Sequence, residues 1–202
     1  MIQIKAIKDW KYVFLDTSVI IDYLCDATKY AKNPPQQNRI EKVQKLFDKI
    51  LFEIKDLTFC ISAITLAELN RGRLEDNIIV EMIGLFGSVE FIDFNASTAI
   101  LLQKDVTKYL GEGQKNQFMA ELAKTLKENS IMSARQWLLD DLKIVACAKI
   151  RHNLGQLDVI LTSDTKTFVP FAQKFQLPCL TSLDIPLDMF GNIDTNTKIT
   201  IQ

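Results

Sequence analysis

Five short runs of apolar, strand-forming residues limit the folds open to this chain more than any other feature. They are apolar at nearly every position, which is typical of strands buried on both faces of a parallel sheet that helices cover. Helical patterns separate the runs, and this alternation predicts an α/β fold with a central, mostly parallel sheet of about five strands. The five runs are residues 12–15, 57–61, 89–94, 159–162 and 179–181.

The segments between the runs carry apolar residues at spacings of three and four, the pattern of helices that pack on a core. The length of 202 residues, with loops too short to be interdomain linkers, predicts one domain. We expect this domain to cover residues 1–187, followed by a polar, loosely attached tail over 188–202. The expected helices are 38–54, 65–73, 77–86, 96–109, 117–129, 134–152 and 165–175, with a polar loop over 32–38.

Three acidic residues stand where the strands of such a sheet would lead to a ligand site. In open α/β sheets, ligands bind at the carboxyl ends of the strands. Asp16 directly follows the first run, and Asp164 comes two residues after the fourth. Glu68 lies one turn into the helix expected after the second run, near the carboxyl end of that strand. We therefore expect the three carboxylates to converge.

A fourth acid lies within the apolar stripe of a long helical pattern. Asp141 shares spacings of three and four with Leu138, Val145 and Ala148. Burying an unpaired carboxylate is expensive, and no basic residue shares this stripe, so a bound cation is expected to compensate. The neighbouring Asp140 takes this place if the helix register shifts by one residue.

Each of these acids also has a local structural interpretation. Asp16 could cap the helix that begins near Val19, and Asp164 could cap the helix that follows it. Glu68 completes the pattern Thr65-x-x-Glu68 of a capping box. The single positions are ambiguous, whereas their joint placement favours a shared site.

Composition narrows the chemistry that this site could support. The one histidine, His152, ends a helical pattern, where a cation suits the helix dipole. The four cysteines form no C-x-x-C pair and are expected to be free thiols, so zinc is not expected. A formal net charge of −1 argues against binding many phosphates by bulk electrostatics. An enzyme of this composition would use its carboxylates.

The chain carries no sign of a membrane or export segment. No apolar run approaches the roughly 20 residues that a membrane span needs. The first ten residues lack the apolar core of a signal peptide. We therefore expect a cytoplasmic protein with no membrane partner.

Four short motifs resemble those of the PIN-domain nucleases, the family that includes the VapC-type toxins of bacterial toxin–antitoxin pairs. Each motif contains one of the four acids, and the third favours Asp141 over Asp140 because its Ile and Ala then fall in register. The resemblance extends from Tyr12 to Thr181. The motifs are residues 13–20, 61–69 followed by Gly72, 141–148, and 160–164 with Phe168.

The resemblance implies a three-layer α/β/α fold with Mg²⁺ or Mn²⁺ at the site. It implies RNA as the substrate, and it is compatible with an antitoxin protein as a partner and with a homodimer. The chain is larger than the compact toxins, with extra residues near 27–55 and 111–136 that we expect to be helical insertions. These leave the identity of both substrate and partner open.

The acids suggest a metal-dependent phosphodiester hydrolysis. Clustered carboxylates repel one another unless a cation neutralises them, and hard oxygen ligands suit Mg²⁺ or Mn²⁺. Asp16 and Asp141 are the expected primary ligands, and Asp164 completes the site. Glu68 binds a second metal or orients the attacking water. Three nearby basic residues could contact phosphate: Arg71, Arg73 and Lys166.

Two other functions can be compared with this one. Aspartate-nucleophile phosphatases need a second acid two residues after the first, where Asp16 is followed by Thr17 and Ser18. A non-catalytic PIN-fold interaction module is the main alternative, although scaffolding does not need four converging carboxylates. Within the nuclease interpretation, a toxin and a housekeeping or defence ribonuclease both stay open, as does single-stranded DNA as the substrate.

Overall fold

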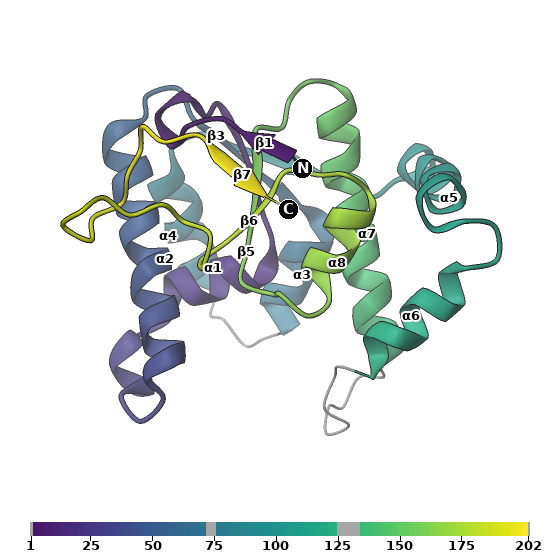
Figure 1. Ribbon diagram of the computed structural model, residues 1–202, viewed down its shortest axis with the longest axis horizontal. Helices are drawn as coiled ribbons and strands as arrows, with labels where there is room; N and C mark the ends of the chain where they lie inside the picture. The colour runs from purple at the N-terminus through teal and green to yellow at the C-terminus, as the bar shows by residue number, and fades with distance from the viewer. Residues whose placement is uncertain (1, 72–75, 125–133, 202) are drawn as a thin grey trace.

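The central feature of the fold is one parallel sheet, seen in a computed structural model that describes residues 2–71, 76–124 and 134–201. In these ranges five parallel strands pair in the order β4-β3-β2-β5-β6 (Figure 1). The predicted α/β fold with a central parallel sheet is therefore confirmed. The strands are β2 (Tyr12–Leu15), β3 (Thr58–Ser62), β4 (Val89–Ile92), β5 (Val159–Thr162) and β6 (Cys179–Thr181).

Both faces of this sheet are buried, as the uninterrupted apolar runs indicated. Successive side chains of a strand point to opposite faces, so one strand supplies two cores. In β2, Val13 and Leu15 join one apolar cluster and Phe14 joins the other. The first cluster includes α1 (Thr17–Leu24), α2 (Pro34–Glu53) and α4 (Asp76–Phe86), and the second includes helices from the later part of the chain.

Helices on both faces give the three-layer arrangement, with α2 and α4 on one side of the sheet and α5 to α8 on the other (Figure 1). Within the described ranges, each helix is too short or too polar to span a bilayer. The remaining helices are α3 (Ala63–Arg71), α5 (Ala96–Leu110), α6 (Lys115–Ala123), α7 (Ala134–Asn153) and α8 (Phe168–Lys174), with 3-10 turns η1 (Ile7–Asp9) and η2 (Ala27–Tyr30).

The start of α2 differs from the sequence prediction. The loop expected over 32–38 is shorter, because α2 begins at Pro34. Proline suits a first helical turn, where no backbone N–H is needed for an intrahelical bond. Both segments expected to be insertions contain helical residues, in α2 and α6, and their status as insertions stays a prediction. Residues 125–129 of the helix predicted over 117–129 lie outside the described ranges.

The C-terminal segment is held more firmly than we expected for a polar tail. Its last strand, β7 (Ile199–Ile201), pairs antiparallel with β1 (Ile2–Ile4) in a separate two-stranded sheet. Ile193 and Ile199 are buried in the same cluster as Val13 and Leu15. Because these isoleucines are scattered among polar residues, the composition of the segment hid their contribution. Strand pairing and burial therefore fix residues 193–201 to the first core.

Aromatic rings form the centre of that first core. Phe59 of β3 packs against both Phe86 and Phe47, with ring centroids 4.4 and 6.0 Å away, and those two rings are 5.6 Å from each other. Tyr23 stacks on Phe47 at 4.5 Å. Phe59 is completely buried, so removal of its ring leaves a cavity bounded by three helices and the sheet.

The substitution Phe59→Ala is expected to lower the free energy of unfolding by about 3–5 kcal/mol, because transfer and cavity costs add. Chemical denaturation measures this change. Phe52→Ala serves as the matched control, since Phe52 is almost fully exposed on α2 and its loss should change stability by less than about 0.5 kcal/mol. Equal effects of the two substitutions would contradict the described core.

Candidate functional site

Asp16 lies at the carboxyl end of the central strand β2 and is only 3% exposed. Its carboxylate caps α1 and accepts hydrogen bonds from the Ser18 N–H at 3.3 Å, from the Ser18 hydroxyl, and from the Thr162 hydroxyl at 2.7 Å. The predicted cap role of Asp16 is therefore confirmed, and the same side chain also lines a pocket. Burial raises the pKa of Asp16, and the hydrogen bonds from Ser18 and Thr162 oppose that rise.

Glu68 reaches the same region from α3. Its carboxylate accepts a hydrogen bond from the Thr17 hydroxyl of α1. The capping-box interpretation with Thr65 as cap is wrong, because α3 begins at Ala63 and the hydroxyl that accepts from the Thr65 N–H is that of Ser62, at 2.9 Å. Glu68 thus faces the end of β2.

The carboxylate of Asp141 on α7 is close enough to the other three acids for their charges to change its pKa. Burial is the main cause that raises its pKa well above the ordinary value, and the charges of Asp16, Asp164 and Glu68 raise it further, against a hydrogen bond from Thr167. The neighbouring Asp140 instead forms an ion pair with Lys143 at 2.7 Å. The structure therefore places Asp141, the register favoured by the sequence, in the pocket.

Asp164 follows β5 in the turn before α8. One carboxylate oxygen accepts from the N–H groups of Lys166 at 2.8 Å and Thr167 at 2.9 Å, and the other accepts from the Thr167 hydroxyl. This turn explains why α8 begins at Phe168 rather than near the predicted residue 165. The predicted cap role is wrong, because the N-cap residue of α8 is Thr167; Asp164 instead closes the turn before the helix, and it also lines the pocket.

The four carboxylates line one pocket of about 310 Å³ at the carboxyl ends of β2, β3 and β5. α1, α3 and α7 converge beyond this end of the sheet (Figure 1). The sequence predictions missed two apolar lining residues, Ile21 and Trp137. Trp137 precedes Asp141 by four residues, so helical spacing could have placed both on one face of α7. The other lining residues are Thr17, Ser18 and Thr167.

These residues fit a divalent cation by their chemistry. Two of the carboxylates have raised pKa values, and the described lining residues include no lysine or arginine to neutralise them. Hydroxyl groups hold Asp16, Glu68 and Asp164 in their present orientations. In that arrangement, no three acidic, histidine or cysteine side chains of the described residues are grouped closely enough to share one ion. Metal binding would require some of these carboxylates to turn from their hydroxyl partners.

Other residues considered from the sequence lie elsewhere. His152 is in the last turn of α7, where burial is the main cause that lowers its pKa. All four cysteines are free thiols, as expected. Lys166 is exposed and does not line the pocket. Gly72 and Arg73 lie outside the described residues, as does the side chain of Arg71.

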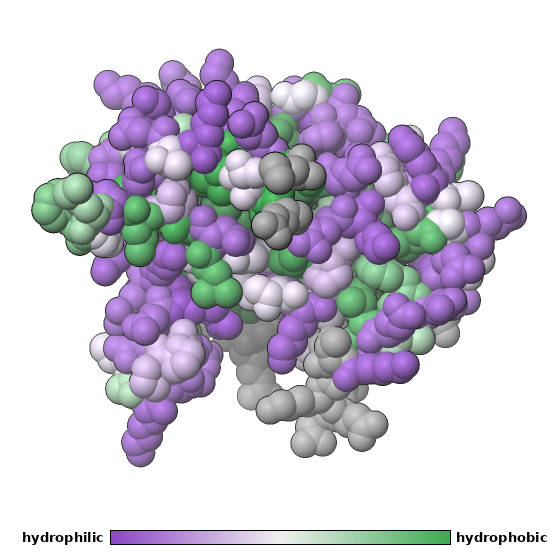
Figure 2. Space-filling model, in the orientation of Figure 1, coloured by the Kyte–Doolittle hydropathy of each residue, from purple (hydrophilic) through white to green (hydrophobic). Residues whose placement is uncertain are grey.

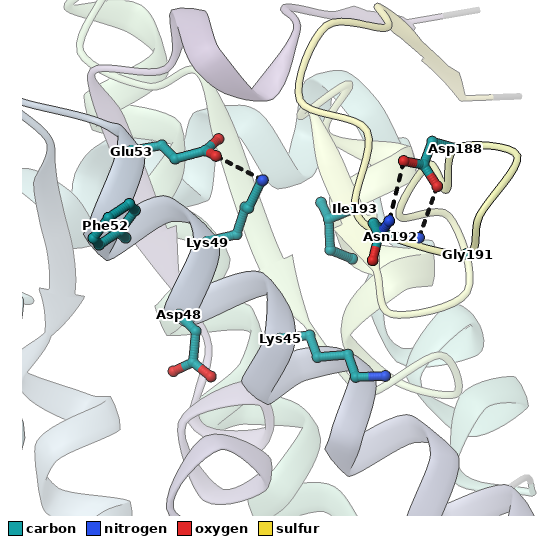
Figure 3. A pocket seen from close by; sticks show the side chains of 9 residues that line it. All are labelled: Lys45, Asp48, Lys49, Phe52, Glu53, Asp188, Gly191, Asn192 and Ile193. Atoms are coloured by element: carbon teal, nitrogen blue, oxygen red, sulfur yellow. Dashed lines mark hydrogen bonds and ion pairs between the residues drawn. The ribbon is translucent and has the colours of Figure 1, made fainter.

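A larger hollow of about 570 Å³ lies between α2 and the loop around residue 190 (Figure 3). Three of the charged groups that line it have partners within it: Lys49 pairs with Glu53 at 2.6 Å, and Asp188 accepts from the Asn192 N–H at 2.8 Å. Around it Phe190 is exposed, and Figure 2 shows apolar atoms over this loop. The converging acids distinguish the smaller pocket as the candidate site for chemistry.

Comparison with known proteins gives a structural match of low sequence identity. No protein-family model matches the sequence, and no curated protein matches it. A solved structure that is similar is that of VapBC2 from Rickettsia felis bound to a DNA fragment from their promoter. The match covers 84% of this chain and 98% of that chain, with 18% sequence identity and a TM-score of 0.46. A parallel five-stranded sheet covered by helices is the architecture that the motif resemblance implied.

In the presence of chelator, Asp141→Asn is expected to raise the free energy of unfolding near neutral pH. With its raised pKa, folded Asp141 binds a proton more tightly than the unfolded chain does, so stability falls as pH rises from the ordinary value of 3.8 through the raised pKa. Asparagine does not ionise and avoids this loss. Thermal denaturation from about pH 4 to about pH 8 should show a gain that shrinks toward the acidic end.

Proposed function

We propose that this protein is a divalent-metal-dependent endoribonuclease that hydrolyses phosphodiester bonds in RNA, with Mg²⁺ or Mn²⁺ as its cofactor. The supporting observation is that Asp16, Glu68, Asp141 and Asp164 come from four separate parts of the chain and line one pocket, in which burial raises the pKa of both Asp16 and Asp141. Grouping charges of one sign costs stability, because they repel one another. A bound cation would offset this cost and so would account for the arrangement.

Asp16 and Asp141 are the proposed primary ligands, because they carry the raised pKa values and would regain their charged forms beside a cation. Asp164 completes the set. A bound divalent cation supplies a lowered pKa for a water molecule and neutralises charge on the phosphate. Glu68, held by the Thr17 hydroxyl, orients the attacking water. The water loses a proton to solvent as its oxygen attacks phosphorus, the bond from phosphorus to the leaving oxygen breaks, and the leaving oxygen takes a proton from solvent.

The same proposal extends to partners through the resemblance of the four motifs to PIN-domain nucleases. An antitoxin protein that blocks the pocket is the proposed partner, and a homodimer is the proposed assembly. A non-catalytic interaction module is the alternative. It leaves the four converging carboxylates without a role, and the nuclease proposal gives each of them one.

The substitution Asp141→Asn should lower the rate of metal-dependent RNA cleavage by about 100-fold or more, because loss of a metal ligand removes several kcal/mol of transition-state stabilisation. Cleavage of a mixed RNA pool in Mg²⁺, Mn²⁺ and chelator measures this. Asp140→Asn is the matched control, because Asp140 pairs with Lys143 and does not line the pocket. Full activity in Asp141→Asn, or equal loss in both variants, would contradict the assignment.

Mg²⁺ and Mn²⁺ should raise the melting temperature of the wild type but not that of Asp141→Asn, since a ligand that binds only the folded state stabilises it by about 2.7 kcal/mol at 100 times its Kd. Differential scanning calorimetry across a metal titration measures the shift. If neither ion changes the melting temperature of the wild type, and the wild type cuts no RNA, these results would instead support the interaction module.

A further inference from the structure

Two large apolar side chains form an exposed wall of the carboxylate pocket. Trp137 of α7 is 43% exposed and Ile21 of α1 is 45% exposed, and both line the pocket with the four acids. Trp137 stands one helical turn before Asp141, on the same face of α7. The pocket therefore offers an acidic, metal-suited part and an aromatic part side by side.

The charge of the pocket makes the aromatic part important for a nucleic-acid ligand. The described lining residues comprise four acids and no lysine or arginine, and the chain has a net charge of −1. The four acids themselves repel the phosphates of a strand. The faces of the bases offer the other source of affinity, because stacking on an aromatic ring is available to every base and needs no positive charge.

We infer that Trp137 stacks on an unpaired nucleobase next to the phosphate held at the carboxylates, with Ile21 packed against the same base. This inference rests on the proposed function, which places the phosphate. The stacked base must be unpaired, because bases inside a duplex are stacked on one another and present only their edges. Trp137 is thus a binding residue that selects unpaired positions.

Other exposed aromatic side chains do not share this setting. Phe52 and Phe190 are more exposed than Trp137, but neither lines the carboxylate pocket. Phe52 instead lines the hollow beside α2. Trp137 has the largest aromatic surface among them. The combination of an exposed indole and converging acids in one small pocket favours a nucleotide, which carries a flat base and a phosphate on one small unit.

Tryptophan fluorescence gives a direct test, because the chain has two tryptophans and Trp10 is only 1% exposed. A single-stranded RNA of about eight nucleotides, labelled at one end with a dye, is titrated in Ca²⁺ with strand integrity checked by gel. The anisotropy of the dye gives the affinity of every variant, including those that lack Trp137. Binding should quench the wild-type fluorescence. Trp137→Ala should weaken binding by about 5- to 140-fold, and Trp137→Phe by less. Phe190→Ala, which removes an exposed ring elsewhere, should bind as the wild type does.

A scan with one abasic nucleotide at each position separates stacking from a general loss of structure. The wild type should lose affinity at one abasic position, and Trp137→Ala should not distinguish that strand from the intact one. Equal affinities of wild type and Trp137→Ala for the intact strand, with no quenching, would overturn the inference even if the wild type cleaves RNA. Quenching and abasic sensitivity without cleavage in Mg²⁺ or Mn²⁺ would uphold base stacking and overturn the nuclease proposal.

Discussion

The burial of β2 on both faces is the constraint on which the rest of this molecule depends. Val13 and Leu15 enter one core and Phe14 the other, so the strand can be formed only with helices on both sides. Its neighbours β3 and β5 pair with it in parallel and end at the same edge of the sheet. Asp16 directly follows β2, and its burial follows from the position of that strand.

The carboxylates show that structural and chemical roles can belong to the same atoms. Asp16 caps α1 while it lies in the pocket, and Asp164 closes the turn before α8 while it lies there too. Hydrogen bonds to hydroxyl and N–H groups offset part of the cost of burying these charges. For Asp16 and Asp141 the offset is incomplete, as the direction of their pKa changes shows. Sites that sacrifice stability in this way are typical of functional pockets.

Much of this fold was predictable because its strands are short, apolar and separated by helical periods. Two-sided burial leaves an apolar signal along β2, β3, β5 and β6. The edge strand β4 was found as well, although Phe91 in it is 45% exposed. Asp141 was recognisable because burying a carboxylate within an apolar stripe costs free energy unless something neutralises its charge. The pairing of β1 with β7 was not predictable, since it joins residues at opposite ends of the chain through isoleucines spread among polar neighbours.

The apolar side of the pocket was missed for a different reason. Ile21 and Trp137 look in the sequence like ordinary core residues of amphipathic helices, and only the arrangement of α1 and α7 around the pocket shows that they remain exposed. Likewise, the hydrogen bond from Thr17 to Glu68 joins residues of two helices that no local pattern connects. Local patterns identified the acids, whereas the shape around them depends on tertiary packing.

The order of the strands along the chain has a consequence for synthesis on the ribosome. β2 and β3 emerge early with Asp16 and Glu68, whereas β5, which closes the other side of β2, comes after α7. At about 5–20 residues per second, Asp141 and Asp164 follow Asp16 only after roughly ten seconds. A nascent chain therefore holds half of the acid set and an incomplete sheet. If the complete pocket cuts RNA, the ribosome that makes this protein and the message it is reading are spared until the last strands have been made.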